Sequence, residues 1–198
     1  MLALVIGLYI PIQAVIGGIT VLTNLNPYVV GLHYFASVVL VALAAVLVYR
    51  VYDGPKPASR VEPRSYHVLV HITSLLVAIT IVVGIVTTGS GPHAGDGGAA
   101  RNGLDSAFLQ HVHSWPAYAT FAASILLVLL APTARLRRFA LILVGIELVQ
   151  IAVGLAQARL GLPELLVGIH MVLACCIAAA MTAVVLSLRR RSTASSAV

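Results

Sequence analysis

Three of the seven histidines, His33, His113 and His170, lie in apolar segments of the chain and at similar depths within them. A single histidine in an apolar helix is usually a hydrogen-bonded core residue, but three at matched depth form a candidate ligand set. A neutral imidazole is a standard axial ligand of haem iron, and a helical bundle can enclose the apolar macrocycle. Zinc fits less well, because no cluster of acidic residues, cysteines or further histidines completes a tetrahedral site there. These histidines therefore indicate an iron porphyrin.

Two of the three histidines belong to an internal repeat. Residues 13–33, QAVIGGITVLTNLNPYVVGLH, align without a gap with residues 150–170, QIAVGLAQARLGLPELLVGIH. The matched polar and small residues, which shared apolar composition would not produce, include Gln13 with Gln150, Gly17 with Gly154 and His33 with His170. We interpret the repeat as a duplicated helical hairpin that places one histidine about two turns into its second helix.

Other polar side chains fall within the same apolar segments. Gln13 and Gln150 are each expected to hydrogen-bond to a neighbouring helix or to a ligand. Glu147 is a carboxyl group in mid-membrane, where an ionisable side chain is costly and often functional. A protonated carboxyl bonded to a neighbouring helix explains it equally well, so both interpretations stay open.

A glycine-rich connection and two arginines could recognise an anionic group. Residues 87–103, TTGSGPHAGDGGAARNG, include Arg101, and glycines let backbone N–H groups approach an anion closely. Arg159 lies near the same side of the membrane. The propionates of a bound haem would point toward both arginines. The alternatives are a flexible surface loop for the glycines and, for Arg159, extension of the side chain to the membrane surface.

The remaining histidines give weaker signals. His67 and His71 are one helical turn apart and could bind a metal from one helix face. Packing and hydrogen bonding at the membrane interface are the more common explanation. His111 and His113 are two residues apart, which is about 200° around a helix, so only one of them can face a given neighbour. His93, in the glycine-rich connection, receives no role.

Composition determines the fold class. Hydrophobic residues make up 60% of the chain, charged residues 9%, and the mean hydropathy is +1.03. A soluble core of this length could not bury so much apolar surface, and in lipid the backbone must satisfy its own hydrogen bonds in helices. We therefore predict an all-α, polytopic membrane protein. Its six expected transmembrane segments are residues 2–24, 28–51, 66–88, 106–131, 138–160 and 165–188.

The basic residues predict the orientation of these segments. Ten of the twelve lysines and arginines follow the second, fourth and sixth segments, and only Arg101 and Arg159 lie on the opposite side. By the positive-inside rule, both termini are expected in the cytoplasm of a multi-pass protein of the plasma membrane. The net charge of +6 is thus a topology signal, and it gives no reason to expect nucleic-acid binding.

Three stretches resemble a known family. QAVIGGITVLTNLNPYVVGLH, VVGIVTTGSGPHAGD and GLPELLVGIHMVLACC are similar to haem A synthases, especially those of actinobacterial type. The resemblance implies a protein of two similar four-helix halves. It also implies oxidation of the C8 methyl group of haem O toward the formyl group of haem A, for the assembly of cytochrome oxidase.

The same resemblance implies that the first two helices of the family are missing before Met1. Residues 1–53 would then be the second hairpin of an incomplete N-terminal bundle, residues 65–190 the C-terminal four-helix haem-binding bundle, and residues 191–198 a cytoplasmic tail. The shortened chain could be inactive alone. Haem O synthase or another polypeptide could complete the N-terminal half.

Site residues also follow from the resemblance. His113 and His170 would be the axial ligands of a haem B cofactor, with Arg101, Arg159 and Gln150 in the same site. His33 would be an iron ligand in the substrate haem O site, beside Gln13. His113 is preferred to His111 because the family has a Gln-x-His pattern in which His111 takes the glutamine position. Residues 114–116, Ser-Trp-Pro, depart from the family, and Glu147 does not align with its catalytic glutamate, so no catalytic residue is assigned.

Two other functions compete with haem A synthesis. A non-catalytic electron carrier resembling a bis-histidine cytochrome b would use the same ligands but would not convert haem O. A small transporter is a third possibility, since transporters often contain repeats. Both copies of this repeat, however, begin at the same membrane face.

Overall fold

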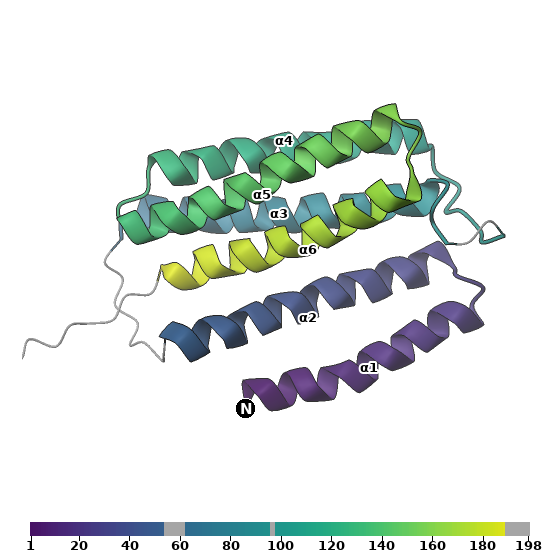
Figure 1. Cartoon of the computed structure of the whole chain (residues 1–198), viewed down its shortest axis with the longest axis horizontal. Coiled ribbons are helices and arrows are strands. Elements are labelled where there is room, and N and C mark those ends of the chain that lie inside the picture. Colours follow the sequence, from purple (N-terminus) through teal and green to yellow (C-terminus); the bar gives the residue numbers. More distant parts are fainter. Residues whose placement is uncertain (54–61, 96–97, 189–198) are drawn as a thin grey trace, which may run out of the picture.

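The computed structural model describes residues 1–53, 62–95 and 98–188, and its secondary structure is entirely helical within that part of the chain (Figure 1). The helices are α1 (Leu2–Leu22), α2 (Pro27–Asp53), α3 (Arg64–Ser90), α4 (Ser106–Leu129), α5 (Ala134–Arg159) and α6 (Glu164–Ser187). All six are long and apolar enough to cross a membrane. The predicted all-α, polytopic fold is therefore confirmed. The expected tail, residues 191–198, lies outside the described residues.

Two helices begin two or more residues earlier than hydropathy predicts. α5 starts at Ala134, four residues before the expected 138, because the Thr133 side chain caps it by accepting a hydrogen bond from the Leu136 N–H at 3.3 Å. α3 starts at Arg64, directly after Pro63. Hydropathy finds the apolar part of a helix, whereas the backbone caps decide where the helix begins.

The helices form antiparallel hairpins whose ends differ in character. At one end, called here the loop end, α1 connects to α2, α3 to α4 and α5 to α6. The opposite end, called the basic end, holds the α4–α5 connection and five described arginines: Arg50, Arg64, Arg135, Arg137 and Arg138. Helices α3 to α6 form a four-helix bundle (Figure 1). α2 packs against both α3 and α6, whereas α1 contacts α2 alone among the described helices.

The turns of the two repeated hairpins share one backbone conformation. Leu25 and Leu162 are matched positions of the repeat, and both have positive φ, at 56° and 60°. Each N–H bonds the carbonyl five residues earlier, of Thr20 and Gln157 respectively, at 2.8 Å. A left-handed leucine is sterically unfavourable and is kept only where the surrounding structure requires it. The sequence repeat is thus also a structural repeat.

The packed core fills only the basic half of the bundle. Its fully buried members include Val70 of α3, Leu127 of α4, Leu143 of α5 and Val184 of α6, all with no exposed surface. The Tyr66 hydroxyl donates a hydrogen bond to the Leu127 carbonyl at 3.1 Å in the same region. The loop half of the bundle is left for a cavity.

Candidate functional site

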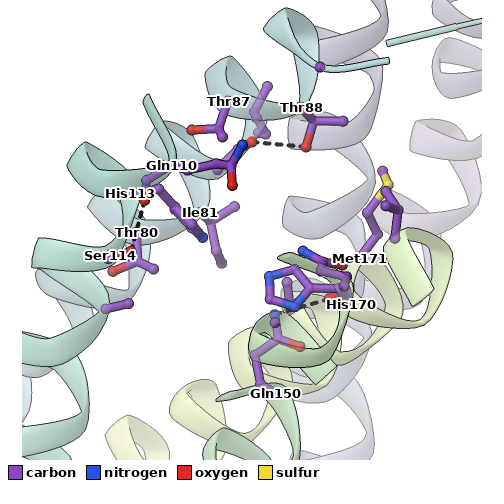
Figure 2. A pocket seen from close by; sticks show the side chains of 18 of the residues that line it. Thr80, Ile81, Thr87, Thr88, Gln110, His113, Ser114, Gln150, His170 and Met171 are labelled. Atoms are coloured by element: carbon purple, nitrogen blue, oxygen red, sulfur yellow. Dashed lines mark hydrogen bonds between the residues drawn. The ribbon is translucent and has the colours of Figure 1, made fainter. Parts of the chain in front are cut away.

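A cavity of about 360 Å³ occupies the loop half of the bundle, between α2, α3, α4, α5 and α6 (Figure 2). This volume lies within the range of about 300–1,000 Å³ typical of small-molecule and cofactor sites. Most of the lining is apolar. The polar and titratable lining residues from α4, α5 and α6 and from the connection after α3 include His93, Gln110, His113, Glu147, Gln150, Gln157 and His170.

His113 and His170 approach each other across this cavity. Their ring centroids are 6.3 Å apart and their planes are inclined by 72°. A metal–imidazole bond is about 2.0–2.1 Å and a ring centroid lies about 1.2 Å behind its nitrogen, so two imidazoles sharing one metal have centroids at most about 6.4–6.6 Å apart. The separation therefore leaves room for one metal atom between the rings. His33 does not line the cavity, so the structure keeps it apart from this pair.

Each of the three rings rests on a glycine of the preceding helix. A Cβ atom added at Gly84 would lie 2.9 Å from Cε1 of His113, and one at Gly154 would lie 3.2 Å from Cε1 of His170. Gly17 stands in the same relation to His33, at 3.1 Å. Gly84 was not singled out in the sequence, because α3 and α4 are outside the repeat. Gly17 and Gly154, in contrast, occupy matched positions of the repeat, and that match marks them in the sequence.

The matched glutamines make the same contact in both hairpins. The Gln150 Nε2 donates to the His170 carbonyl at 3.1 Å, and the Gln13 Nε2 donates to the His33 carbonyl at 2.9 Å. Gln13 also donates to the Ser37 hydroxyl. Each glutamine thus joins the two helices of its hairpin at the level of the histidine, as expected of a polar group in an apolar segment.

Several buried polar atoms around the cavity lack a hydrogen-bond partner among the described residues. They include Nδ1 of His113 and His170, Oε1 of Gln150 and Gln157, and Oε2 of Glu147. A buried polar atom without a partner costs about 1–3 kcal/mol, so this set points to a group that occupies the cavity. Two imidazoles, an apolar wall and glycines under both rings fit haem.

Glu147 lies at the inner wall of the cavity. It is 4% exposed, and its Oε1 accepts a hydrogen bond of 2.9 Å from the hydroxyl of Ser124 on α4. This contact matches the interpretation of Glu147 as a carboxyl bonded to a neighbouring helix. Its position on the cavity lining also keeps it near the candidate site.

The two arginines lie elsewhere. The Arg101 guanidinium donates to the carbonyls of Ala99 at 2.7 Å and Pro92 at 2.5 Å, so it holds its own loop together. Arg159 is an exposed residue at the end of α5, and neither arginine lines the cavity. His93 is a lining residue instead, and its Nε2 lies 2.6 Å from the Leu162 carbonyl. No role for His93 was predictable from the sequence, because its partner is a backbone atom in a turn far along the chain.

The other histidines face away from the cavity. His111 is exposed, with its Nδ1 2.8 Å from the Ala107 carbonyl, so His113 is the one of the two that faces the bundle. His67 lies 3.6 Å from Glu62 at the basic end, and His71 is exposed. In the described part of the chain, no three histidine, cysteine or acidic side chains gather as a metal site.

Comparison with known proteins places this geometry in a family. A family model named COX15-CtaA and described as a cytochrome oxidase assembly protein matches residues 1–182. The chain belongs to the COX15-CtaA, or haem A synthase, family. Neither the curated proteins nor the solved structures gave a match. The match covers α1 to α5 and most of α6, so both repeated hairpins and the paired histidines belong to the COX15-CtaA region. The family supports a role in haem A synthesis for cytochrome oxidase assembly, in a multi-pass membrane protein.

Proposed function

We propose that the chain is a haem A synthase that binds haem B between His113 and His170 and oxidises the C8 methyl group of haem O toward a formyl group. The observation that carries the proposal is the 6.3 Å separation of the two imidazole rings across an apolar cavity. The activity of this chain by itself is part of what the experiments below test.

The chain's own residues would hold and shield the cofactor. His113 from α4 and His170 from α6 would hold the haem iron between them. Gly84 and Gly154 let both rings lie against the preceding helices, and Gln150 fixes the backbone of His170. The apolar lining excludes water. Haem B in this position supplies reversible one-electron transfer.

We assign the substrate haem to the α1–α2 hairpin, where His33 repeats the setting of His170 on its own glycine and glutamine. His33 would hold the haem O iron and Gln13 would keep the His33 backbone in place. His113 and His170 would hold the haem B cofactor in the bundle, and His33 would hold the substrate haem at the hairpin. The two haems would thus have separate sites in the chain.

The decisive experiment expresses the chain in cells that make haem O and extracts the pigments. Haem A, or its hydroxylated precursor, should be present with the wild-type chain and absent with His33→Ala. The His33→Ala protein should retain its haem B spectrum. Equal loss of haem from His33→Ala and His170→Ala would overturn the division between the two sites.

An electron carrier resembling cytochrome b is the second candidate. One observation favours it: two imidazoles face each other across the cavity, and such a pair would hold a haem suited to electron transfer alone. The pigment extraction separates the two functions, because a carrier returns haem B alone and leaves haem O unchanged.

We further propose that the basic end faces the cytoplasm of a plasma-membrane protein, with both termini on that side. The excess of arginines at that end supports this orientation. We also propose that haem O synthase or another polypeptide packs beside the α1–α2 hairpin, because α1 contacts only α2 among the described helices. Single cysteines introduced at Arg137 and Arg159, labelled in intact cells, test the orientation. Photo-crosslinking from Leu8, an exposed α1 residue, tests the partner.

A further inference from the structure

A second hollow lies in the basic half of the molecule, away from the candidate haem cavity. It is a groove of about 620 Å³ between α2, the first turns of α5 and the last turns of α6. α2 and α6 lie side by side (Figure 1), and the Tyr34 hydroxyl bonds the Met171 carbonyl at 2.7 Å toward the loop end. Toward the basic end, the groove runs between the same two helices.

Small side chains create the groove. Its wall includes Ala44 and Ala45 on α2 and Ala179 and Ala183 on α6. Small residues on facing helices normally let the two helices come into close contact. Here the space above the methyl groups is left open instead. In a bilayer, an apolar group from the surroundings must fill this groove.

The dimensions of the groove fit a single hydrocarbon chain. Along α2 it runs from Val41 to Tyr52, which is about 16 Å at 1.5 Å per residue. One leaflet of the hydrocarbon core is about 15 Å thick. The groove has a volume of about 620 Å³ along this length.

An arginine stands at the basic end of the groove. The Arg135 guanidinium lies 5.7 Å from the ring centroid of Tyr49 and 5.9 Å from that of Phe139, and it donates to the Tyr49 hydroxyl at 2.5 Å. All three residues line the groove. Aromatic contacts of this kind fix the orientation of a guanidinium, whose planar fork matches the oxygens of a phosphate group.

We propose that this groove is a binding site for one anionic phospholipid, with an acyl chain between α2 and α6 and the phosphate at Arg135. Basic pockets between transmembrane helices characteristically bind anionic head groups. The exposed Arg50, Arg137 and Arg138 add positive charge at the same end. A quinone could fill the apolar part of the groove, but its neutral head group would gain little from this charge.

Native mass spectrometry of the purified, delipidated chain tests the proposal. The probes are phosphatidylglycerol and phosphatidylcholine with identical acyl chains. We expect one phosphatidylglycerol per chain, bound at least tenfold more tightly than phosphatidylcholine. Arg135→Gln should lower phosphatidylglycerol affinity to the phosphatidylcholine level. The matched control Arg137→Gln removes the same charge from an exposed position two residues away and should change the affinity less than twofold.

A second variant tests the acyl-chain part of the site. Ala183→Leu fills the groove without changing its charge, so it should abolish tight binding of the anionic lipid. If circular dichroism shows that the Arg135→Gln protein does not fold, the binding of phosphatidylglycerol to the Ala183→Leu protein still tests the proposal. Equal affinity for the two lipids, equal effects of Arg135→Gln and Arg137→Gln, or unchanged binding by Ala183→Leu would each overturn the proposal. A quinone that co-purifies and is displaced by Ala183→Leu would identify a quinone site instead. None of these measurements requires haem.

Discussion

Tyr34 and Met171 each directly follow one copy of the repeat, 137 residues apart, and they touch: the Tyr34 hydroxyl donates to the Met171 carbonyl at 2.7 Å. This contact packs α2 against α6 and joins the N-terminal hairpin to the bundle.

Removing the Tyr34 hydroxyl should weaken that junction. Tyr34→Phe keeps the ring but deletes the hydrogen bond, which contributes about 0.5–1.5 kcal/mol in a typical case. We expect a lower thermal midpoint in detergent, with unchanged haem content in the bundle. Tyr28→Phe, on the same helix and 63% exposed, is the control and should leave the midpoint where it was. A Tyr34→Phe protein as stable as the wild type would show that apolar packing alone holds α2 to α6.

The paired histidines should be distinguishable from their neighbour by spectroscopy. His113→Ala and His170→Ala each leave the iron with one imidazole, so the reduced absorption spectrum should lose its six-coordinate, low-spin form. His111→Ala is the control, because this exposed side chain points away from the cavity two residues from His113. Loss of the low-spin spectrum in His111→Ala, with retention in His113→Ala, would reverse the assignment.

Glycine substitutions should test the close approach of helix and ring. A methyl group at Gly84 or Gly154 would lie 2.9 Å or 3.2 Å from Cε1 of its histidine and must displace it. Overpacking of this kind costs about 1–3 kcal/mol, which corresponds to a loss of haem affinity of about 5- to 150-fold. The larger loss is expected for Gly84→Ala, measured by haem titration.

Gly145→Ala is the matched control for this pair. Gly145 lies on α5 like Gly154, but a Cβ atom there meets nothing within 4 Å. Haem affinity should be unchanged. Similar losses in all three variants would mean that helix flexibility, and not contact with the imidazoles, governs binding.

His93 should slow the release of haem from the cavity. Its hydrogen bond to the Leu162 carbonyl holds the connection after α3 against the α5–α6 turn, at the lining of the cavity. His93→Ala removes this hydrogen bond, which contributes about 1 kcal/mol to keeping the cavity closed. Haem should therefore transfer to apomyoglobin about fivefold faster from the variant than from the wild type. Glu164 lies 3.8 Å from the same ring but is 87% exposed, so Glu164→Gln should release haem at the wild-type rate.

The buried carboxyl of Glu147 should tolerate a neutral replacement. Glu147→Gln can still accept the hydrogen bond of Ser124, so stability should change little. Glu147→Leu leaves the Ser124 hydroxyl without its acceptor. The free energy of unfolding, measured by chemical denaturation, should therefore fall by about 1–3 kcal/mol. A Glu147→Gln protein that folds and binds haem but makes no haem A would instead give this carboxyl a part in proton transfer.

The sequence predicted the parts of this structure that depend on local pattern. Apolar runs predicted six helices, and the gapless repeat predicted a duplicated hairpin with one histidine in each second helix. The sequence left open whether Gln13 and Gln150 bond a helix or a ligand, and the structure shows each bonding the histidine carbonyl of its own hairpin. The contact of Gly84 with His113 was not predictable in this way, because it depends on how α3 packs against α4. The hydrogen bond between His93 and Leu162 joins a loop to a distant turn, and Arg101 bonds carbonyls of its own loop. Neither contact produces a repeating pattern in the sequence, so neither could be predicted from it.

The packed core and the cavity occupy opposite halves of the same bundle. Aliphatic and aromatic side chains hold α3 to α6 together at the basic end, while the loop half encloses the space between the two imidazoles. The helices of the bundle are therefore held together by contacts that do not involve an occupant of the cavity.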